Sequence, residues 1–139
     1  MSFLSADAAI RDIVSSQVNN YVRTLYSMPP DHGAAVVSII LDDAGLRAEW
    51  LEELDEMRGR LDEMSMLLND KLAERVSNRD FSHLVRTRGM FCFLGISAEQ
   101  VGRLKTDYGV YMVDSSRINV AGITPDNVDY LAESIAAVV

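Results

Sequence analysis

The feature that most constrains the fold is a long helical periodicity that runs from about Leu46 to Val76. Along it, apolar side chains recur at alternating steps of four and three residues, with acidic residues on the flanks: Trp50, Leu54, Met57, Leu61, Met64 and Leu68. This heptad-like stripe fits a coiled-coil dimer or a long helix laid across its own domain. The second alternative is favoured, because the stripe lasts under three heptads and Lys71 occupies its next position.

Two shorter helical elements are predicted before this stretch. Apolar residues at three- and four-residue steps indicate a helix from Ala6 to about Leu25, with Asp7 at the positive end of its dipole. Pro29 and Pro30 must end that helix, since neither has an N–H to donate. A turn at residues 31–33 and a compact apolar segment over residues 34–41 follow, and the segment is predicted to be a short buried helix that Gly45 or its neighbours separate from the long one. Residues 1–4 have the pattern of the end of a strand.

The second half of the chain has the spacing of short strands and two more helices. Strands are predicted over residues 81–85, 90–94, 109–113 and 117–120, the first two paired around a turn at residues 86–89. Ser97 is predicted to cap a helix over residues 98–107, and Thr124 with Pro125 to begin a helix that runs to the end. Trp50 and the seven methionines are interpreted as packing residues. The architecture expected is α+β, with long helices packed on a small sheet.

The charge balance excludes some classes of partner. The formal net charge is -8, and residues 42–75 carry eleven acidic and five basic side chains. Nucleic acid and anionic membranes require a basic face, so we expect neither as a partner. The single cysteine, Cys92, excludes an internal disulfide and is interpreted as a packed residue rather than a nucleophile. No metal site is predicted. With no apolar run of membrane-spanning length and no leader pattern, we expect a soluble, cytoplasmic protein.

One arginine near the end of the chain has the setting of a binding residue. Arg117 stands among small and polar residues in the run 116–122, beside a strand pattern that follows the apolar run 89–93. The guanidinium presents a planar fork of N–H donors that pairs with the two oxygens of a carboxylate. On spacing alone, however, an ordinary surface arginine beside a strand is the commoner interpretation.

Three segments, taken in order, resemble one family. Residues 23–34 are similar to the Arg-x-x-Tyr-Ser-Asn-Pro-Pro-x-His-Gly run of the aspartate and aromatic amino acid aminotransferases, although Met28 stands where the family usually has asparagine. Residues 78–81 leading into 89–95 resemble the next segment of that family, and residues 109–111 with 116–127 resemble a third. The resemblance extends from about residue 16 to near the end of the chain.

The resemblance implies a role for each of five residues. Arg117 matches the arginine that binds the substrate α-carboxylate, and Arg23 matches the arginine that reaches into the neighbouring subunit's site to bind the distal carboxylate of a dicarboxylic substrate. Phe91 matches an aromatic residue lining the substrate pocket, while Tyr26 and Ser27 belong to the loop that carries Arg23. Members of the family use pyridoxal 5'-phosphate to move an amino group between an amino acid and a 2-oxo acid, and they work as dimers. A homo-oligomer is therefore expected.

The resemblance also implies that part of the family's machinery lies outside this sequence. The chain resembles about the last third of such an enzyme: residues 1–43 correspond to the end of the large domain with connecting helices, and residues 44–139 to the small C-terminal domain of a PLP-transferase-like fold (α/β by family). The family's Schiff-base lysine sits in a Ser-x-Ser-Lys type segment, which neither Lys71 nor Lys105 matches. No catalytic or cofactor-binding residue is therefore assigned, and the isolated chain is expected not to bind the cofactor or to transaminate.

Two other functions remain open. The chain fits a non-catalytic folding or association module derived from the aminotransferase, in which the first helix and the stripe from Trp50 to Leu68 drive self-association. It also fits a domain that binds carboxylates through Arg117 alone, although one arginine without a closed pocket should bind weakly. Between aspartate and aromatic substrates the sequence does not decide, because the same arginine pair serves both in this family.

Overall fold

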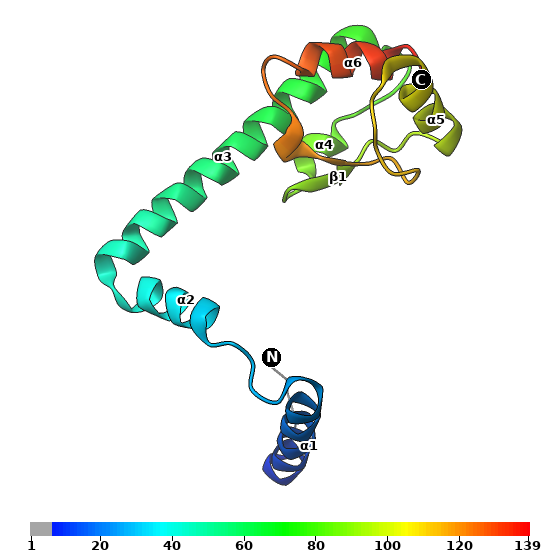
Figure 1. The fold of residues 1–139 in the computed structure, drawn as a ribbon. Helices are drawn as coiled ribbons and strands as arrows, with labels where there is room; N and C mark the ends of the chain where they lie inside the picture. The colour runs from blue at the N-terminus through cyan, green and yellow to red at the C-terminus, as the bar shows by residue number, and fades with distance from the viewer. Residues whose placement is uncertain (1–6) are drawn as a thin grey trace. The chain divides into compact units, whose positions relative to one another are not determined.

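The computed structural model describes residues 7–139, so the strand expected over residues 1–4 lies outside the described residues. Its elements follow the order helix, helix, long helix, then a mixed region (Figure 1): α1 (Ala8–Tyr26), α2 (His32–Asp42), α3 (Ala44–Arg75), α4 (His83–Arg86), β1 (Phe91–Phe93), α5 (Ala98–Tyr108), β2 (Arg117–Asn119), η1 (Val120–Gly122) and α6 (Val128–Ala136). The chain divides into two compact units, one reaching to Ala48 and one from Glu49 to Val139. Mostly helical with a two-stranded sheet, it confirms the α+β class.

The first unit contains α1 and α2. Asp7 caps α1 as predicted, because its carboxylate accepts the N–H of Ala9 at 2.7 Å. The prolines end α1 as expected, and α2 covers the predicted segment but begins earlier, so the turn expected at residues 31–33 is wrong: His32 is already helical. The predicted burial of α2 is also wrong, since neither helix has a buried side chain among the described residues.

The long helix α3 confirms the dominant sequence feature. It begins one residue after α2, where the Asp43 carboxylate accepts the N–H groups of Gly45 (2.8 Å) and Leu46 (2.9 Å). The break therefore falls at Asp43, and Gly45 lies inside α3.

Burial along α3 differs from the predicted stripe. The predicted stripe is buried at Met64 and Leu68 and continues at Leu72 and Val76 in steps of four. In its N-terminal half Trp50 and Met57 are exposed, at 40% and 54%, while Leu54 and Leu61 are half-buried. The buried half packs within the same chain, which is the intrachain alternative.

The methionines do not act as packing residues throughout. Within residues 7–139, Met64 is buried and Met112 packs half-buried against the core, but four are exposed: Met28, Met57, Met66 and Met90. An unbranched thioether side chain is tolerated at such positions as readily as inside. The apolar character of a methionine therefore did not predict its burial.

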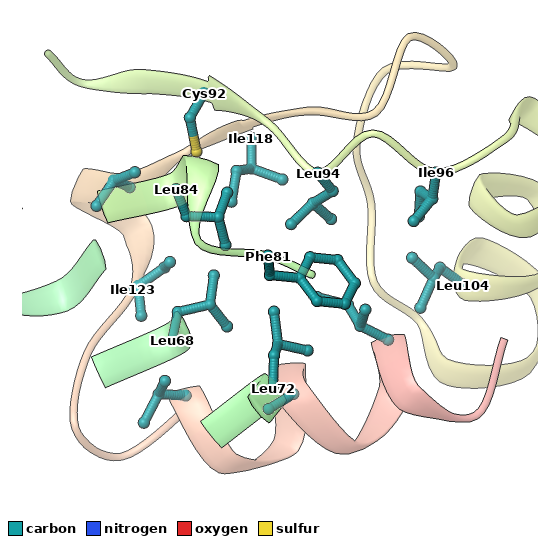
Figure 2. Close-up of a cluster of buried hydrophobic side chains, with 14 of the residues drawn as sticks. Leu68, Leu72, Phe81, Leu84, Cys92, Leu94, Ile96, Leu104, Ile118 and Ile123 are labelled. Carbon is teal, nitrogen blue, oxygen red and sulfur yellow. The ribbon is translucent and has the colours of Figure 1, made fainter. Parts of the chain in front are cut away.

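The second unit has a closed hydrophobic core. Figure 2 shows side chains from α3, α4, α5 and both strands converging, with Phe81 between Leu72 and Leu94 and the sulfur of Cys92 pointing inward. Leu72, Leu94 and Leu104 have no exposed surface. Burying apolar side chains of this size is the main favourable term in folding, at about 1.5–3 kcal/mol each.

The sheet is smaller than predicted and pairs differently. β1 pairs antiparallel with β2 in the register Phe91↔Asn119, Cys92↔Ile118 and Phe93↔Arg117. The strand expected over residues 81–85 is instead a turn followed by α4. Phe81 and Leu84 are buried at a spacing of three while Val85 is exposed, which is the period of a helical turn and not of a strand.

The strand expected over residues 109–113 is also absent from the described sheet. Val110 and Met112 are half-buried while Tyr111 and Val113 are exposed, so the alternation is real. The sheet of the described chain consists of β1 and β2 alone, so residues 109–113 have no strand to pair with there. Alternation therefore identified the two faces of this segment but not its pairing.

The ends of α5 and α6 are fixed by capping residues. Ser97 caps α5 as predicted, in a capping box with Gln100, and Gly109 closes it in the left-handed region at φ 62°. The cap predicted at Thr124 is wrong: residues 124–127 form a turn, and Asn127 is the N-cap of α6.

The helices α3 and α6 are joined by ion pairs. The side chains of Lys71 and Arg75 on α3 both contact the carboxylate of Asp129 on α6, at 3.0 and 2.8 Å. No helix within residues 7–139 is long and apolar enough to cross a membrane.

Candidate functional site

The two strands carry the candidate substrate-binding residues on one face. Cys92 and Ile118 are paired across the strands and are buried in the core. Because side chains alternate along a strand, Phe91, Phe93, Arg117 and Asn119 lie on the opposite, exposed face. The structure thus brings two of the predicted residues, Arg117 and Phe91, together on neighbouring strands.

Arg117 and Phe91 form a cation–π pair. The guanidinium carbon of Arg117 lies over the Phe91 ring, 5.1 Å from its centroid. The two residues are diagonal neighbours across the strand pair, which is the separation over which long and aromatic side chains still meet. The attraction between the cation and the ring holds the guanidinium beside Phe91 without using a hydrogen-bond acceptor.

No acceptor among residues 7–139 competes for the Arg117 guanidinium: no hydrogen bond or ion pair engages it there. Two arginines of the second unit show the contrast, because their donors are occupied. Arg75 is paired with Asp129, and Arg60 donates to the carbonyl oxygens of Ala121 and Ile123 at 3.3 and 2.9 Å. An arginine whose donors are free is ready to pair with two oxygens of a carboxylate.

A pocket of about 550 Å³ lies beside this arginine within the second unit. Its walls come from the extended segment after α5, from the two strands and from the start of α6: Phe91, residues 109–113, Arg117, Ile118, Asn119, Gly122, Ile123, Asn127, Tyr130 and Leu131. Mostly apolar walls with a few polar groups are typical of small-molecule sites. The pocket suits an organic anion whose carboxylate meets Arg117.

The structure places Arg23, Tyr26 and Ser27 in the first unit. Arg23 lies in the last turn of α1, where its carbonyl oxygen accepts the N–H of Ser27 at 3.0 Å. Ser27 follows the helix with a positive φ of 57°, and Tyr26 is exposed. No acceptor engages the Arg23 guanidinium among the described residues, so it too is free to bind an anion.

The lysines do not fit the anchoring role for pyridoxal phosphate. Lys71 is held by Asp129, and the amine of Lys105 lies 2.6 Å from Asp114. Both amines are engaged by carboxylates, whereas the amine of a Schiff-base lysine must be available to the cofactor. Neither lines the pocket beside Arg117.

Cys92 is placed in the core and not at the pocket. Cys92 is buried, and desolvation raises the pKa of its thiol, so it is a core residue as predicted. No cluster of metal-ligating side chains occurs among the residues that the structure describes.

Sequence reasoning missed several residues of the pocket. Asn119 could have been found, because two-residue alternation places it on the same face as Arg117. Tyr111, in the segment after α5, and Tyr130, at the start of α6, also line the pocket. No local pattern in the sequence signals that convergence.

Comparison with known proteins gives a consistent relationship. A family model described as "Aminotransferase class I and II" matches residues 3–135. The chain is 47% identical over 137 residues to an aspartate aminotransferase of Escherichia coli (strain K12), covering 99% of this chain and 35% of that protein. It is 41% identical over 138 residues to the aromatic-amino-acid aminotransferase of the same organism, with the same coverage.

The fold agrees with solved structures. An aromatic-amino-acid aminotransferase from Burkholderia pseudomallei, covalently bound to pyridoxal phosphate, matches with a TM-score of 0.89 and 40% identity, over 97% of this chain and 34% of that one. The chain therefore spans about a third of the length of the relatives that it matches, and the similarity covers nearly all of the chain.

Proposed function

The chain belongs to the class I and II aminotransferase family, and from this premise we propose that it is the carboxylate-binding, C-terminal part of a pyridoxal-phosphate-dependent aminotransferase. The reaction moves an amino group between aspartate or an aromatic amino acid and a 2-oxo acid. The observation that carries this proposal is the Arg117 guanidinium, held over Phe91 at the edge of an apolar pocket without a competing acceptor.

Arg117 binds the α-carboxylate that every such substrate has. Its planar donor fork makes two parallel hydrogen bonds and so fixes the orientation of the substrate as well as its position. Phe91 lines the substrate site and keeps the guanidinium plane from rotating. Asn119, on the same face of the strands, adds polar character to the pocket wall.

Arg23 binds the second carboxylate of a dicarboxylic substrate, in the site of a neighbouring subunit. Its position in the last turn of α1, with no acceptor among the described residues, supports this role. Tyr26 and Ser27 shape the segment that presents it. The proposal includes a homo-oligomer, because a residue that works in a neighbour's site requires one.

The family's cofactor supplies the stabilisation of the substrate carbanion when it is bound. The residues of this chain do not provide its anchoring lysine, since both amines are engaged by carboxylates. The chain by itself therefore contributes substrate binding and orientation, and no step of the reaction is derived from it.

We assign residues 44–139 to the small domain and residues 1–43 to the end of the large domain with its connecting helices. The start of α3 at Ala44, one residue after α2, supports this boundary. A cytoplasmic location is also proposed: a cytoplasmic aspartate aminotransferase of rice, 39% identical, supports it, although a mitochondrial relative from Arabidopsis thaliana has similar identity.

Two experiments test the proposal. Succinate added to the 139-residue chain should shift the NMR signal of the Arg117 Nε–H group, and Arg117→Lys should weaken that binding, because an ammonium cannot form the paired bonds. Arg88→Lys is the matched control, since that arginine pairs with Asp62 on the surface. If succinate does not shift the Arg117 Nε–H signal, the proposal is contradicted.

The second experiment concerns turnover. With pyridoxal phosphate, aspartate and 2-oxoglutarate, the isolated chain is expected to give no product above a buffer blank. Borohydride treatment of the same mixture should leave neither Lys71 nor Lys105 modified specifically. Turnover, or a specific adduct on one lysine, would show that a lysine of this chain takes the anchoring role.

A second candidate function is a non-catalytic association module. It is favoured by the apolar side chains of the first unit that remain exposed in the structure of this chain, including Ile13, Leu25 and Ile39 at 61–71%. Exposed apolar side chains mark an association surface where they form one contiguous patch. Sedimentation at a series of concentrations tests this second function: a monomer at every concentration removes the association module, and with it the homo-oligomer of the first proposal, while carboxylate binding by Arg117 is unaffected.

A further inference from the structure

The residue immediately before Arg117 has an unusual conformation. Ser116 has a φ of 61°, in the left-handed region that side chains other than glycine rarely adopt. It is also 1% exposed, which is uncommon for a serine. A buried polar residue in a strained backbone conformation persists only where its surroundings fix it.

The surroundings of Ser116 are three hydrogen bonds to two other segments. Its carbonyl oxygen accepts the N–H of Leu94 at 2.9 Å, and its hydroxyl oxygen accepts the N–H of Gly95 at 3.1 Å. Its own N–H donates to the carbonyl oxygen of Val113 at 2.9 Å. One residue therefore binds two successive amides of the segment that leaves β1.

These bonds continue the strand pair beyond its last regular step. Phe93↔Arg117 is the final Cα pair of the ladder, and the bonds of Ser116 lock the chain one residue further on. On the other side, Gly95 has a φ of 74° and its carbonyl oxygen accepts from the Arg79 guanidinium. Both strands that carry the cation–π pair are thus tied together at the Ser116 hydroxyl.

We propose that Ser116 is a positioning residue for Arg117, which it aims over Phe91 through the hydrogen bond from Gly95 N–H to its hydroxyl. This inference rests on the proposed carboxylate-binding role of Arg117. Ser116 does not touch the substrate. It determines how β2 leaves the turn at residues 114–115 and, with that, the direction of the next side chain.

A merely structural role makes a different prediction. If Ser116 only stabilised the fold, its replacement would lower the melting temperature, but the Arg117–Phe91 pair would be intact in every molecule that remains folded. A positioning role changes the pair in the folded state itself. The measurement must therefore report the geometry of the pair well below the melting temperature.

NMR of the 139-residue chain provides that measurement. The Nε–H proton of an arginine above an aromatic ring is shifted upfield by the ring current, and Phe91→Leu gives the value without the ring. We expect Ser116→Ala and Ser116→Gly both to move the Arg117 signal most of the way to the Phe91→Leu value. Ser115→Ala is the matched control, because Ser115 is exposed in the same turn, and it should leave the signal unchanged.

The two substitutions separate the hydroxyl from the backbone conformation. Ser116→Ala removes the acceptor and keeps the strain at φ 61°, whereas Ser116→Gly removes the acceptor and relieves the strain. A signal that stays at its original position in either folded variant overturns the proposal. If Ser116→Ala does not fold, the glycine variant decides alone.

Succinate titration of the same samples adds a second readout. Both variants should bind about tenfold more weakly than the original chain, because a misdirected guanidinium loses the paired geometry. Unchanged affinity in both variants contradicts the positioning role. If the original chain itself ignores succinate, the proposed function fails, while the ring-current comparison still decides whether Ser116 positions Arg117.

Discussion

At the scale of single residues, the same side-chain type does different work according to what its neighbours offer. Arg75 is surrounded by carboxylates and joins two helices, and Arg60 caps backbone carbonyl oxygens after β2. Arg117 finds an aromatic ring but no acceptor within the described chain. The unused hydrogen-bonding capacity of Arg117 is what makes it a candidate for binding an external anion.

Cys92 gives a residue-scale prediction. The thiolate is the reactive form, and burial both shields the Cys92 sulfur and raises the pKa of its thiol. Alkylation by iodoacetamide at pH 8 should therefore be at least about a hundredfold slower in the folded chain than in guanidinium chloride, because it requires an opening of the core. Mass spectrometry follows the reaction. Similar rates in the two states would mean that Cys92 is accessible in the native fold.

At this scale the sequence suggests candidates more readily than it predicts conformations. The resemblance points to Arg117 and Phe91, and strand alternation is enough to put both on an exposed face. The positive φ of Ser116 has no local signal, because serine is not a residue that favours it. It follows from the bonds to Leu94 and Gly95, which lie more than twenty residues earlier.

At the scale of elements, periodicity identified the helices, and failed where two periods compete over a few residues. The segment 81–85 reads equally well as a short strand or a helical turn, and the packing of Phe81 and Leu84 into the core selected the turn. The pairing of β1 with β2 was not predictable locally either. It joins segments separated by the whole of α5.

The contact between α3 and α6 gives a pH-dependent prediction. A hydrogen bond from Lys71, and the charges of Lys71 and Arg75, lower the pKa of Asp129 below its ordinary value of 3.8. A carboxylate with a lowered folded-state pKa stabilises the fold at pH values above 3.8, and that stabilisation is lost as the pH falls through the folded-state value. Asp129→Asn should therefore lower the melting temperature at pH 7.

The effect should be small, because half of the Asp129 side chain is exposed to solvent. It should shrink as the pH falls below 3.8, because Asp129 then takes up a proton in the unfolded chain, and it takes one up in the folded chain at the lower folded-state pKa. Asp126→Asn is the matched control, an exposed aspartate in the turn just before α6. Thermal unfolding at several pH values provides the comparison, and a difference between Asp129→Asn and the original chain that is constant from pH 7 to pH 3 would contradict the ion-pair account.

At the scale of the whole molecule, stability is concentrated in the second unit. All buried hydrophobic residues of the described chain lie between Met64 and Val138, and α1 and α2 contribute none. Both helices of the first unit were predicted correctly, α1 from its apolar periodicity and α2 from a compact apolar segment. The sequence of a helix could not predict whether its apolar side chains are covered, because coverage depends on other segments and not on the helix itself.

The last prediction follows from this unequal distribution. A chain of residues 44–139 should unfold in urea with nearly the same free energy as the full chain, since it retains the entire core cluster. Leu68→Ala, which removes a side chain that is 1% exposed, should cost about 2–5 kcal/mol in either length of chain. In the full chain, amide hydrogens of α1 and α2 should exchange far faster than those of residues 64–75. If shortening the chain costs as much as Leu68→Ala, the first unit contributes to the stability of the second, and the independence of the core would be wrong.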